Sequence, residues 1–323
     1  MTNRDRTYFL VFAISPVILA FCLLMGPAGF GLPDWTTQRE IMILRITRVL
    51  AGLIVGAALS VAGVVLQAIL RNPLAEPYVL GVSSGASLGA ALAILFGLSA
   101  LGAFTLPLMA FLLAIATLAA VYKLASSPGS APSLYSLILS GVIVSSVCSS
   151  LLMFLVSLAP VEGMHSILWW MLGNLDVSSN ALLATTGGVV LAGFIGIWLL
   201  APEFNALTLG HDMAHYLGVR VRLAIGIGLL LATLITAASV GIAGLIGFVG
   251  LIVPHVMRAL VGPDHRRLIP ACALGGGAFL AVCDAIARTV MSAEIPVGVV
   301  TALVGGPFFL VLLRTRRKEQ WLS

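Results

Sequence analysis

Asp284 is a carboxylate in an otherwise apolar run of the sequence, and Arg288 follows it four residues later. On a helix these two side chains share a face, which predicts an ion pair. If the run crosses a membrane, an unpaired carboxylate there costs roughly 2.5–3.5 kcal/mol, so Asp284 needs a partner or a function. The alternative to the ion pair is a proton-relay acid in an ion-coupled secondary transporter. Such carriers normally place several acids around one cavity, whereas Asp284 is nearly alone.

The histidines and lysines limit the chemistry that the chain can perform. His211 and His215 are four residues apart and could hold a metal ion, but no glutamate follows them in a catalytic pattern. His165 could be an axial haem ligand, although its neighbours Trp169 and Trp170 are typical of a membrane interface. No G-x-x-x-x-G-K-S/T motif is present, so the chain cannot hold ATP in a P-loop. The sequence therefore predicts no catalytic residue, no metal site and no cofactor.

The elements that must position these residues are membrane spans. Hydrophobic residues make up 60% of the 323 residues and charged residues 9%, against about 25% charged in a typical soluble domain. No linker divides the chain, so residues 1–323 are expected to form one transmembrane domain. About 20 apolar residues cross a bilayer. This length predicts an all-α bundle of about ten spans, near 8–28, 49–70, 79–97, 103–122, 134–159, 181–201, 223–241, 243–261, 268–287 and 296–313.

The basic residues orient these spans, because cytoplasmic loops are enriched in lysine and arginine. If both termini are cytoplasmic, only Arg39, Arg45, Arg48 and Arg288 of the 17 lysines and arginines face outside. The net charge of +5 is then a signal of topology and does not indicate nucleic-acid binding.

The outer arginines run against this trend and need an explanation. Arg45 and Arg48 stand at positions i and i+3 just before the second predicted span, where they share a helical face. They either anchor the helix at the interface by snorkelling or pair with acidic residues of an external docking protein. Arg288 would join them at the outer end of the ninth span.

A proline-rich break, RNPLAEP, separates the second and third spans and predicts a cytoplasmic turn. The glycines that follow recur every four residues and predict a face for close helix packing. Ser83 and Ser84 either cap the next helix or line an aqueous path. The largest cytoplasmic loop, about residues 203–222, predicts a short amphipathic helix outside the bilayer, which needs a protein partner.

Three long motifs carry a resemblance to a known family. They are RNPLAEPYVLGVSSGASLGA, GFVGLIVPHVMRALVGPDHRRLIP and EIPVGVVTALVGGPFFLVLLR. On these motifs the sequence resembles the FecCD family, the permease subunits of bacterial ABC importers for iron–siderophores, haem and cobalamin. The likeness extends over nearly the whole chain.

This resemblance implies a type II importer in the bacterial inner membrane. Two permease copies would form a homodimer that works with two cytoplasmic ATP-binding subunits and an external substrate-binding protein. The residues implied to couple to the ATPase are Leu209, Gly210, His211, Met213, Tyr216, Leu217 and Gly218. The implied docking residues for the binding protein are Arg45, Arg48 and Arg288, and those of the cytoplasmic gate are Ser83, Ser84, Leu134 and Tyr135.

Overall fold

The computed structural model describes residues 3–26, 29–31, 38–126, 133–177, 179–291 and 293–320. These residues form a helical bundle with one small hairpin. The α-helices are α1 (Asn3–Leu24), α2 (Arg39–Ile69), α3 (Val82–Leu95), α4 (Thr105–Ala125), α5 (Leu134–Leu158), α6 (Val161–Met171), α7 (Asn180–Leu199), α8 (Ala201–Leu207), α9 (His211–Tyr216), α10 (Val221–Ala243), α11 (Val249–Val261), α12 (His265–Thr289) and α13 (Val297–Gln320). The remaining elements are the 3-10 helices η1 (Pro77–Leu80) and η2 (Leu98–Leu101) and the strands β1 (Met25–Gly26) and β2 (Gly29–Phe30).

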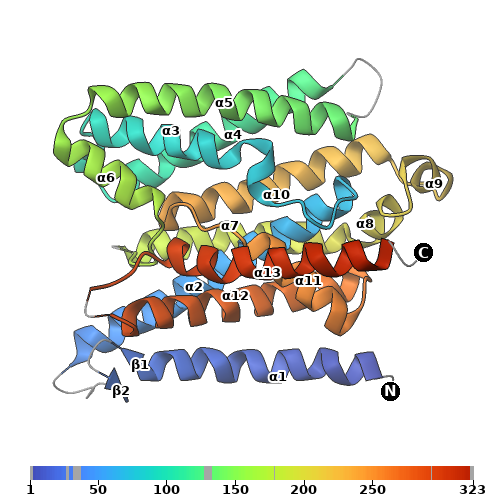
Figure 1. The fold of residues 1–323 in the computed structure, drawn as a ribbon, viewed down its shortest axis with the longest axis horizontal. Helices are drawn as coiled ribbons and strands as arrows, with labels where there is room; N and C mark the ends of the chain where they lie inside the picture. Colours follow the sequence, from blue (N-terminus) through green and yellow to red (C-terminus); the bar gives the residue numbers. More distant parts are fainter. Residues whose placement is uncertain are drawn as a thin grey trace.

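The long helices lie along the long dimension of the bundle, and both chain ends lie at the same end of it (Figure 1). We name this the terminal end, and α8 and α9 lie there as well. The antiparallel β1–β2 hairpin lies at the opposite end, which we name the hairpin end.

Each of the ten predicted apolar segments coincides with a helix. Among the described residues, seven helices are long and apolar enough to cross a membrane, namely α1, α2, α4, α5, α7, α10 and α12. Three apolar helices are shorter, namely α3, α11 and the part of α13 between Val297 and Leu312. Several boundaries differ from the prediction: α2 begins at Arg39 instead of residue 49, α11 begins at Val249 instead of 243, and α13 ends at Gln320 instead of 313. The predicted loop before the sixth span also contains a helix, α6.

Helix α2 is the centre of the bundle, and 78% of its most apolar stretch is buried. Two of its glycines touch the backbones of neighbouring helices. A Cβ at Gly56 would collide with the carbonyl of Gly276 in α12, and one at Gly63 would collide with the carbonyl of Gly250 in α11. Small residues allow this close approach, which is the main packing device between helices in lipid.

The RNPLAEP break is more than the predicted cytoplasmic turn. Arg71 and Asn72 are exposed, but Pro77 occupies the space beside Gly250 together with the carbonyl of Leu59. Leu59 lies ten residues before α2 ends, which is about 15 Å along the helix axis. The chain therefore turns back into the bundle before α3 begins, and this is why α3 is short.

The break before α3 lies beside the break before α11, and polar groups join the two. The Tyr78 hydroxyl donates to the carbonyl of Ile246 and accepts from its amide, each at 3.1 Å. The Glu76 carboxylate accepts from the amide of Phe248 at 2.5 Å. Phe248 precedes α11 with a φ of 69°, a conformation that side-chain-bearing residues adopt only when neighbouring contacts hold it.

Candidate functional site

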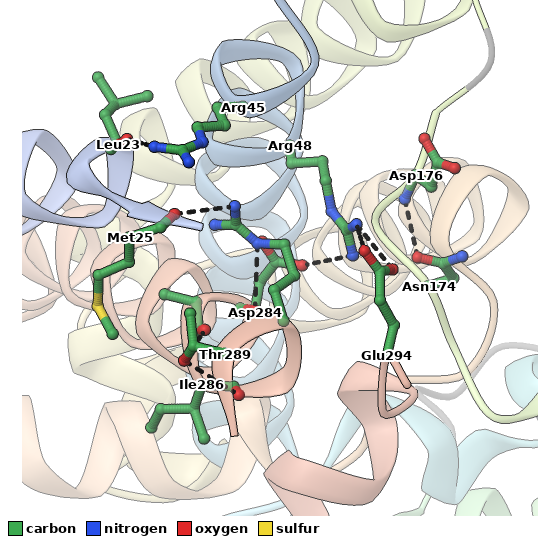
Figure 2. Close-up of polar contacts among 12 residues, drawn as sticks. Leu23, Met25, Arg45, Arg48, Asn174, Asp176, Asp284, Ile286, Thr289 and Glu294 are labelled. Carbon is green, nitrogen blue, oxygen red and sulfur yellow. Dashed lines mark hydrogen bonds and ion pairs between the residues drawn. The ribbon is translucent and has the colours of Figure 1, made fainter. Parts of the chain in front are cut away.

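An ionic cluster lies at the hairpin end, with Asp284 of α12 at its centre (Figure 2). Asp284 is 0% exposed. Its Oδ2 lies 2.8 Å from Nε of Arg288, one turn later, and its Oδ1 lies 3.1 Å from Nη2 of Arg48 in α2. The predicted Asp284–Arg288 pair is confirmed. The second arginine was not predicted to join it, because it comes from a helix 236 positions away in the sequence.

Glu294 is the member of this cluster that meets solvent. Nη1 of Arg48 donates to both carboxylate oxygens of Glu294 at 2.9 Å, and the Glu294 side chain is 49% exposed. Asp176 is also close enough to interact electrostatically with Arg48. Arg48 is therefore shared between a buried carboxylate and an exposed one.

Arg45 and Arg288 also hold the hairpin against the bundle. Nη1 of Arg45 donates to the carbonyl of Gly31 at 2.7 Å and to that of Leu23 at 3.2 Å. Nη1 of Arg288 donates to the carbonyl of Met25 at 3.2 Å. Gly26 packs so closely on the Arg45 guanidinium that a Cβ has no room there.

The position of these arginines changes how a docking role must be understood. Arg45, Arg48 and Arg288 are only 5%, 4% and 3% exposed, so the expectation that they face a partner directly is corrected. The cause is the early start of α2, which makes Arg45 and Arg48 part of a buried helix instead of a preceding loop. The docking role itself remains a prediction, with Glu294 as the exposed group that a partner would meet first.

The predicted coupling segment forms two short helices, α8 and α9, at the terminal end (Figure 1). Gly210 and Gly218 flank α9 with φ angles of 113° and 85°, which glycine adopts without a steric cost. Four apolar side chains of this segment are exposed to between 51% and 84%, namely Leu209, Met213, Tyr216 and Leu217.

His211 lies half-buried at the start of α9. Burial lowers the pKa of its imidazole, and the nearby Arg71 lowers it further, against the opposing effect of Asp212. The ring is therefore neutral near pH 7. Among the described residues no group of three His, Cys, Asp or Glu side chains could hold a metal ion, so the metal interpretation of His211 and His215 finds no third ligand there.

Asn205 of α8 ties the coupling segment to the turn between α11 and α12. Its amide nitrogen donates to Oδ1 of Asp264 at 2.7 Å, which fixes the orientation of the carboxamide because a carboxylate only accepts. Its oxygen accepts from the amide of His265 at 2.9 Å and lies 2.7 Å from Nδ1 of that buried ring. Nδ1 therefore carries a proton.

The charge of Asp264 is favoured by the same contacts. Burial alone would raise the pKa of this carboxyl, but the hydrogen bonds from Asn205 and from the Arg266 amide, together with the nearby charge of Arg266, outweigh burial and lower it. We name Asn205, Asp264 and His265 the terminal latch. Sequence reasoning missed it, because the 59 positions between Asn205 and Asp264 leave no local signal in the sequence.

The predicted gate residues lie on two helices and have no hydrogen bond to one another among the described residues. The Ser84 hydroxyl donates to the carbonyl of Gly81 at 3.0 Å, and α3 has no side-chain cap. Ser133, by contrast, caps α5 by accepting from the Ser136 amide at 3.0 Å. Leu134 is half-buried and Tyr135 is 77% exposed. The gate thus remains a prediction.

A bundle of apolar helices around one buried helix, with two short helices that expose apolar side chains at one end, fits a membrane transport permease. The model of the FecCD transport family matches residues 10–315, and the chain belongs to this family of ABC importer permeases.

Named relatives and a solved structure agree with this membership. The chain is 42% identical to the cobalamin import system permease protein BtuC of Halobacterium salinarum, over 90% of this chain and 77% of the relative. It is 37% identical to the hemin transport system permease protein HmuU of Yersinia pestis, over 94% and 95%. A solved inward-facing structure assigned to the metal-chelate type of ABC transporter superimposes with a TM-score of 0.86 at 33% identity, over 96% of this chain and 99% of that one.

Proposed function

We propose that the chain is the translocation subunit of an importer that carries a metal chelate or a corrinoid into the bacterial cytoplasm. The expected substrates are an iron–siderophore, haem or cobalamin. The names of two relatives support this class, since one is described for cobalamin and another for hemin. Because those names differ, the proposal is a class of bulky metal complexes and not one compound.

In this proposal residues 1–323 form one domain whose ten apolar helices all cross the inner membrane, with both termini in the cytoplasm. The concentration of basic residues towards the terminal end supports this orientation. Two copies would assemble as a homodimer, and the exposed apolar side chains of α5 and α13 are available to lipid and to the second copy. Examples are Val142 on α5 and Leu303 and Leu310 on α13.

ATP-binding subunits would dock on α8 and α9 and drive transport. The observation that carries this proposal is the set of exposed apolar side chains on α9 and its flanks, with Tyr216 at 84% exposure. Apolar groups gathered on a surface mark an interaction site. The segment from Leu209 to Gly218 is the proposed coupling surface. Ser83, Ser84, Leu134 and Tyr135 remain the proposed cytoplasmic gate.

The decisive experiment co-expresses the chain with its cognate ATP-binding subunits and measures their co-purification. Met213→Ser with Tyr216→Ser should abolish co-purification, because it removes the apolar contact area without touching the bundle core. The matched control is Leu101→Ser with Met291→Ser, which are 78% and 64% exposed but are expected to lie on the other side of the membrane. Equal co-purification of both variants would contradict the proposed coupling surface.

A further inference from the structure

A groove of about 650 Å³ opens at the terminal end between the last turn of α4, α9 and the first three turns of α10. The part nearest the terminal end, which we call the upper part, is basic and polar. Its lining contains Arg220, Arg222, His215 and Tyr122. Its lower part is apolar and continues along α10 through Leu223 and Ile227 to Leu230. Leu230 lies about 14 Å along the helix axis from Val221, so the groove runs from the end of the bundle into the apolar span.

The two arginines of the groove have no internal partner. Neither Arg220 nor Arg222 forms an ion pair or a side-chain hydrogen bond with any described residue. Both side chains are exposed, and guanidinium groups stay charged at any physiological pH. Two unpaired positive charges therefore lie at the rim of a groove whose lower part is apolar.

Gly226 keeps the middle of the groove open. A Cβ at this position would lie 3.4 Å from the hydroxyl of Tyr122, so the hydroxyl faces the glycine across the floor of the groove. That hydroxyl has no hydrogen-bond partner among the described residues. It is free to donate to a phosphate oxygen at the boundary between the basic and the apolar part.

We propose that this groove binds an anionic phospholipid, with its phosphate between Arg220 and Arg222 and one acyl chain along Leu223, Ile227 and Leu230. The charge of the rim fits a phosphate, for which guanidinium groups are the preferred partners. Basic pockets between membrane helices bind anionic headgroups in this way. A soluble ATP-binding subunit does not fit the lower part, because that part lies within the apolar length of α10.

Native mass spectrometry of the detergent-purified full chain tests this proposal, with phosphatidylglycerol and phosphatidylcholine of the same acyl chains as probes. Phosphatidylglycerol should bind the wild type more tightly than phosphatidylcholine does. Each arginine near a headgroup contributes about five-fold in affinity, so Arg220→Gln with Arg222→Gln should weaken phosphatidylglycerol binding about 30-fold. The matched control, Arg6→Gln with Arg266→Gln, removes the same charge at the same end of the bundle but outside the groove, and it should leave binding unchanged.

Two further arms separate the lipid from other occupants. Gly226→Leu fills the floor of the groove while keeping both arginines, and it should reduce phosphatidylglycerol binding as strongly as their loss does. Glycerol 3-phosphate, which has an anionic phosphate but no acyl chains, should not compete. Equal weakening by the control pair, unaltered binding in Gly226→Leu, or full competition by glycerol 3-phosphate would each overturn the proposal. So would loss of the lipid whenever a second copy or an ATP-binding subunit associates, because the groove would then be a protein interface.

Discussion

At the scale of one residue, the neighbours of Asp284 determine whether its carboxylate can exchange protons. Both of its oxygens face guanidinium groups, and no part of it reaches solvent. A proton-relay acid must exchange protons with water, whereas this carboxylate is enclosed by Arg48 and Arg288. A buried ion pair contributes little net stability, but the loss of one partner leaves the others buried and uncompensated. The geometry therefore favours a structural role for Asp284.

Asp284→Asn should destabilise the protein by about 3–5 kcal/mol, because two buried guanidinium groups lose their shared carboxylate. The measurement is the thermal unfolding midpoint of the purified chain in detergent. Asp176→Asn is the control, since Asp176 is an exposed acid near the same cluster and its loss should shift the midpoint little. If Asp284→Asn kept wild-type stability and lost uptake alone, Asp284 would be a coupling acid of the ion-driven kind.

Glu294→Gln tests the docking prediction without disturbing the buried pair. The exposed carboxylate competes for Arg48, so its neutralisation should speed association with an acidic face of the binding protein several-fold at low salt. The gain should shrink near physiological ionic strength, where screening acts over about 8 Å. Stopped-flow association kinetics measure this, with the exposed Glu162→Gln as the control. Identical rates for all three proteins at low salt would exclude Arg48 from docking.

At the scale of the element, the terminal latch joins the coupling segment to the start of α12. Asn205→Leu should break this connection and leave the buried His265 ring without an acceptor, at a cost of about 1–3 kcal/mol. We expect the assembled transporter to hydrolyse ATP but to import less substrate per ATP. The measurement is the ratio of uptake to hydrolysis in proteoliposomes. The control is Thr208→Val, one turn later, whose hydroxyl donates only to the Asn205 carbonyl. An unchanged ratio of uptake to hydrolysis in Asn205→Leu would show that the latch does not transmit motion.

The glycines of α2 make a second prediction at this scale. Gly63→Ala should destabilise the bundle by about 1–3 kcal/mol or more, because the added methyl group collides with the backbone of Gly250 and neither helix can move away without repacking. Gly188→Ala in α7, where nothing lies within 4 Å of the added group, should be neutral or slightly stabilising. Thermal unfolding in detergent compares the two, and equal midpoints would mean that α2 and α11 separate easily.

The sequence predicted elements well and their meeting points poorly, for physical reasons. The lengths of the apolar runs located every helix that could span a membrane. The spacing of Asp284 and Arg288 predicted the ion pair between them. The role of Arg48 was not predictable, since its partner lies 236 positions away. The return of the chain into the bundle at Pro77 was not predictable either, because a proline ends a helix but does not determine the direction of the chain that follows. Helix α6 was missed because its short apolar run resembled an interfacial loop.

At the scale of the whole molecule, the number of crossings between two positions decides whether they share a side of the membrane. Helices α4, α5 and α7 separate Leu101 from Tyr216, and α10, α11 and α12 separate Tyr216 from Met291. If every one crosses, Leu101 and Met291 lie outside and Tyr216 lies in the cytoplasm. If the short α11 did not cross, Met291 would change sides. Whether α11 crosses the membrane therefore tests the ten-span topology as well as its orientation.

Substituted cysteines make this test direct. The native Cys22, Cys272 and Cys283 are buried, and a Cys148→Ala background removes the half-buried fourth. In that background a membrane-impermeant maleimide should label Leu101→Cys and Met291→Cys in intact cells, because both positions are exposed at the proposed outer side. Tyr216→Cys, at 84% exposure in the chain expressed without its ATP-binding subunits, should react only after the membrane is broken. Labelling of Tyr216→Cys in intact cells would reverse the orientation, and labelling of Leu101→Cys without Met291→Cys would show that α11 enters and leaves on one side.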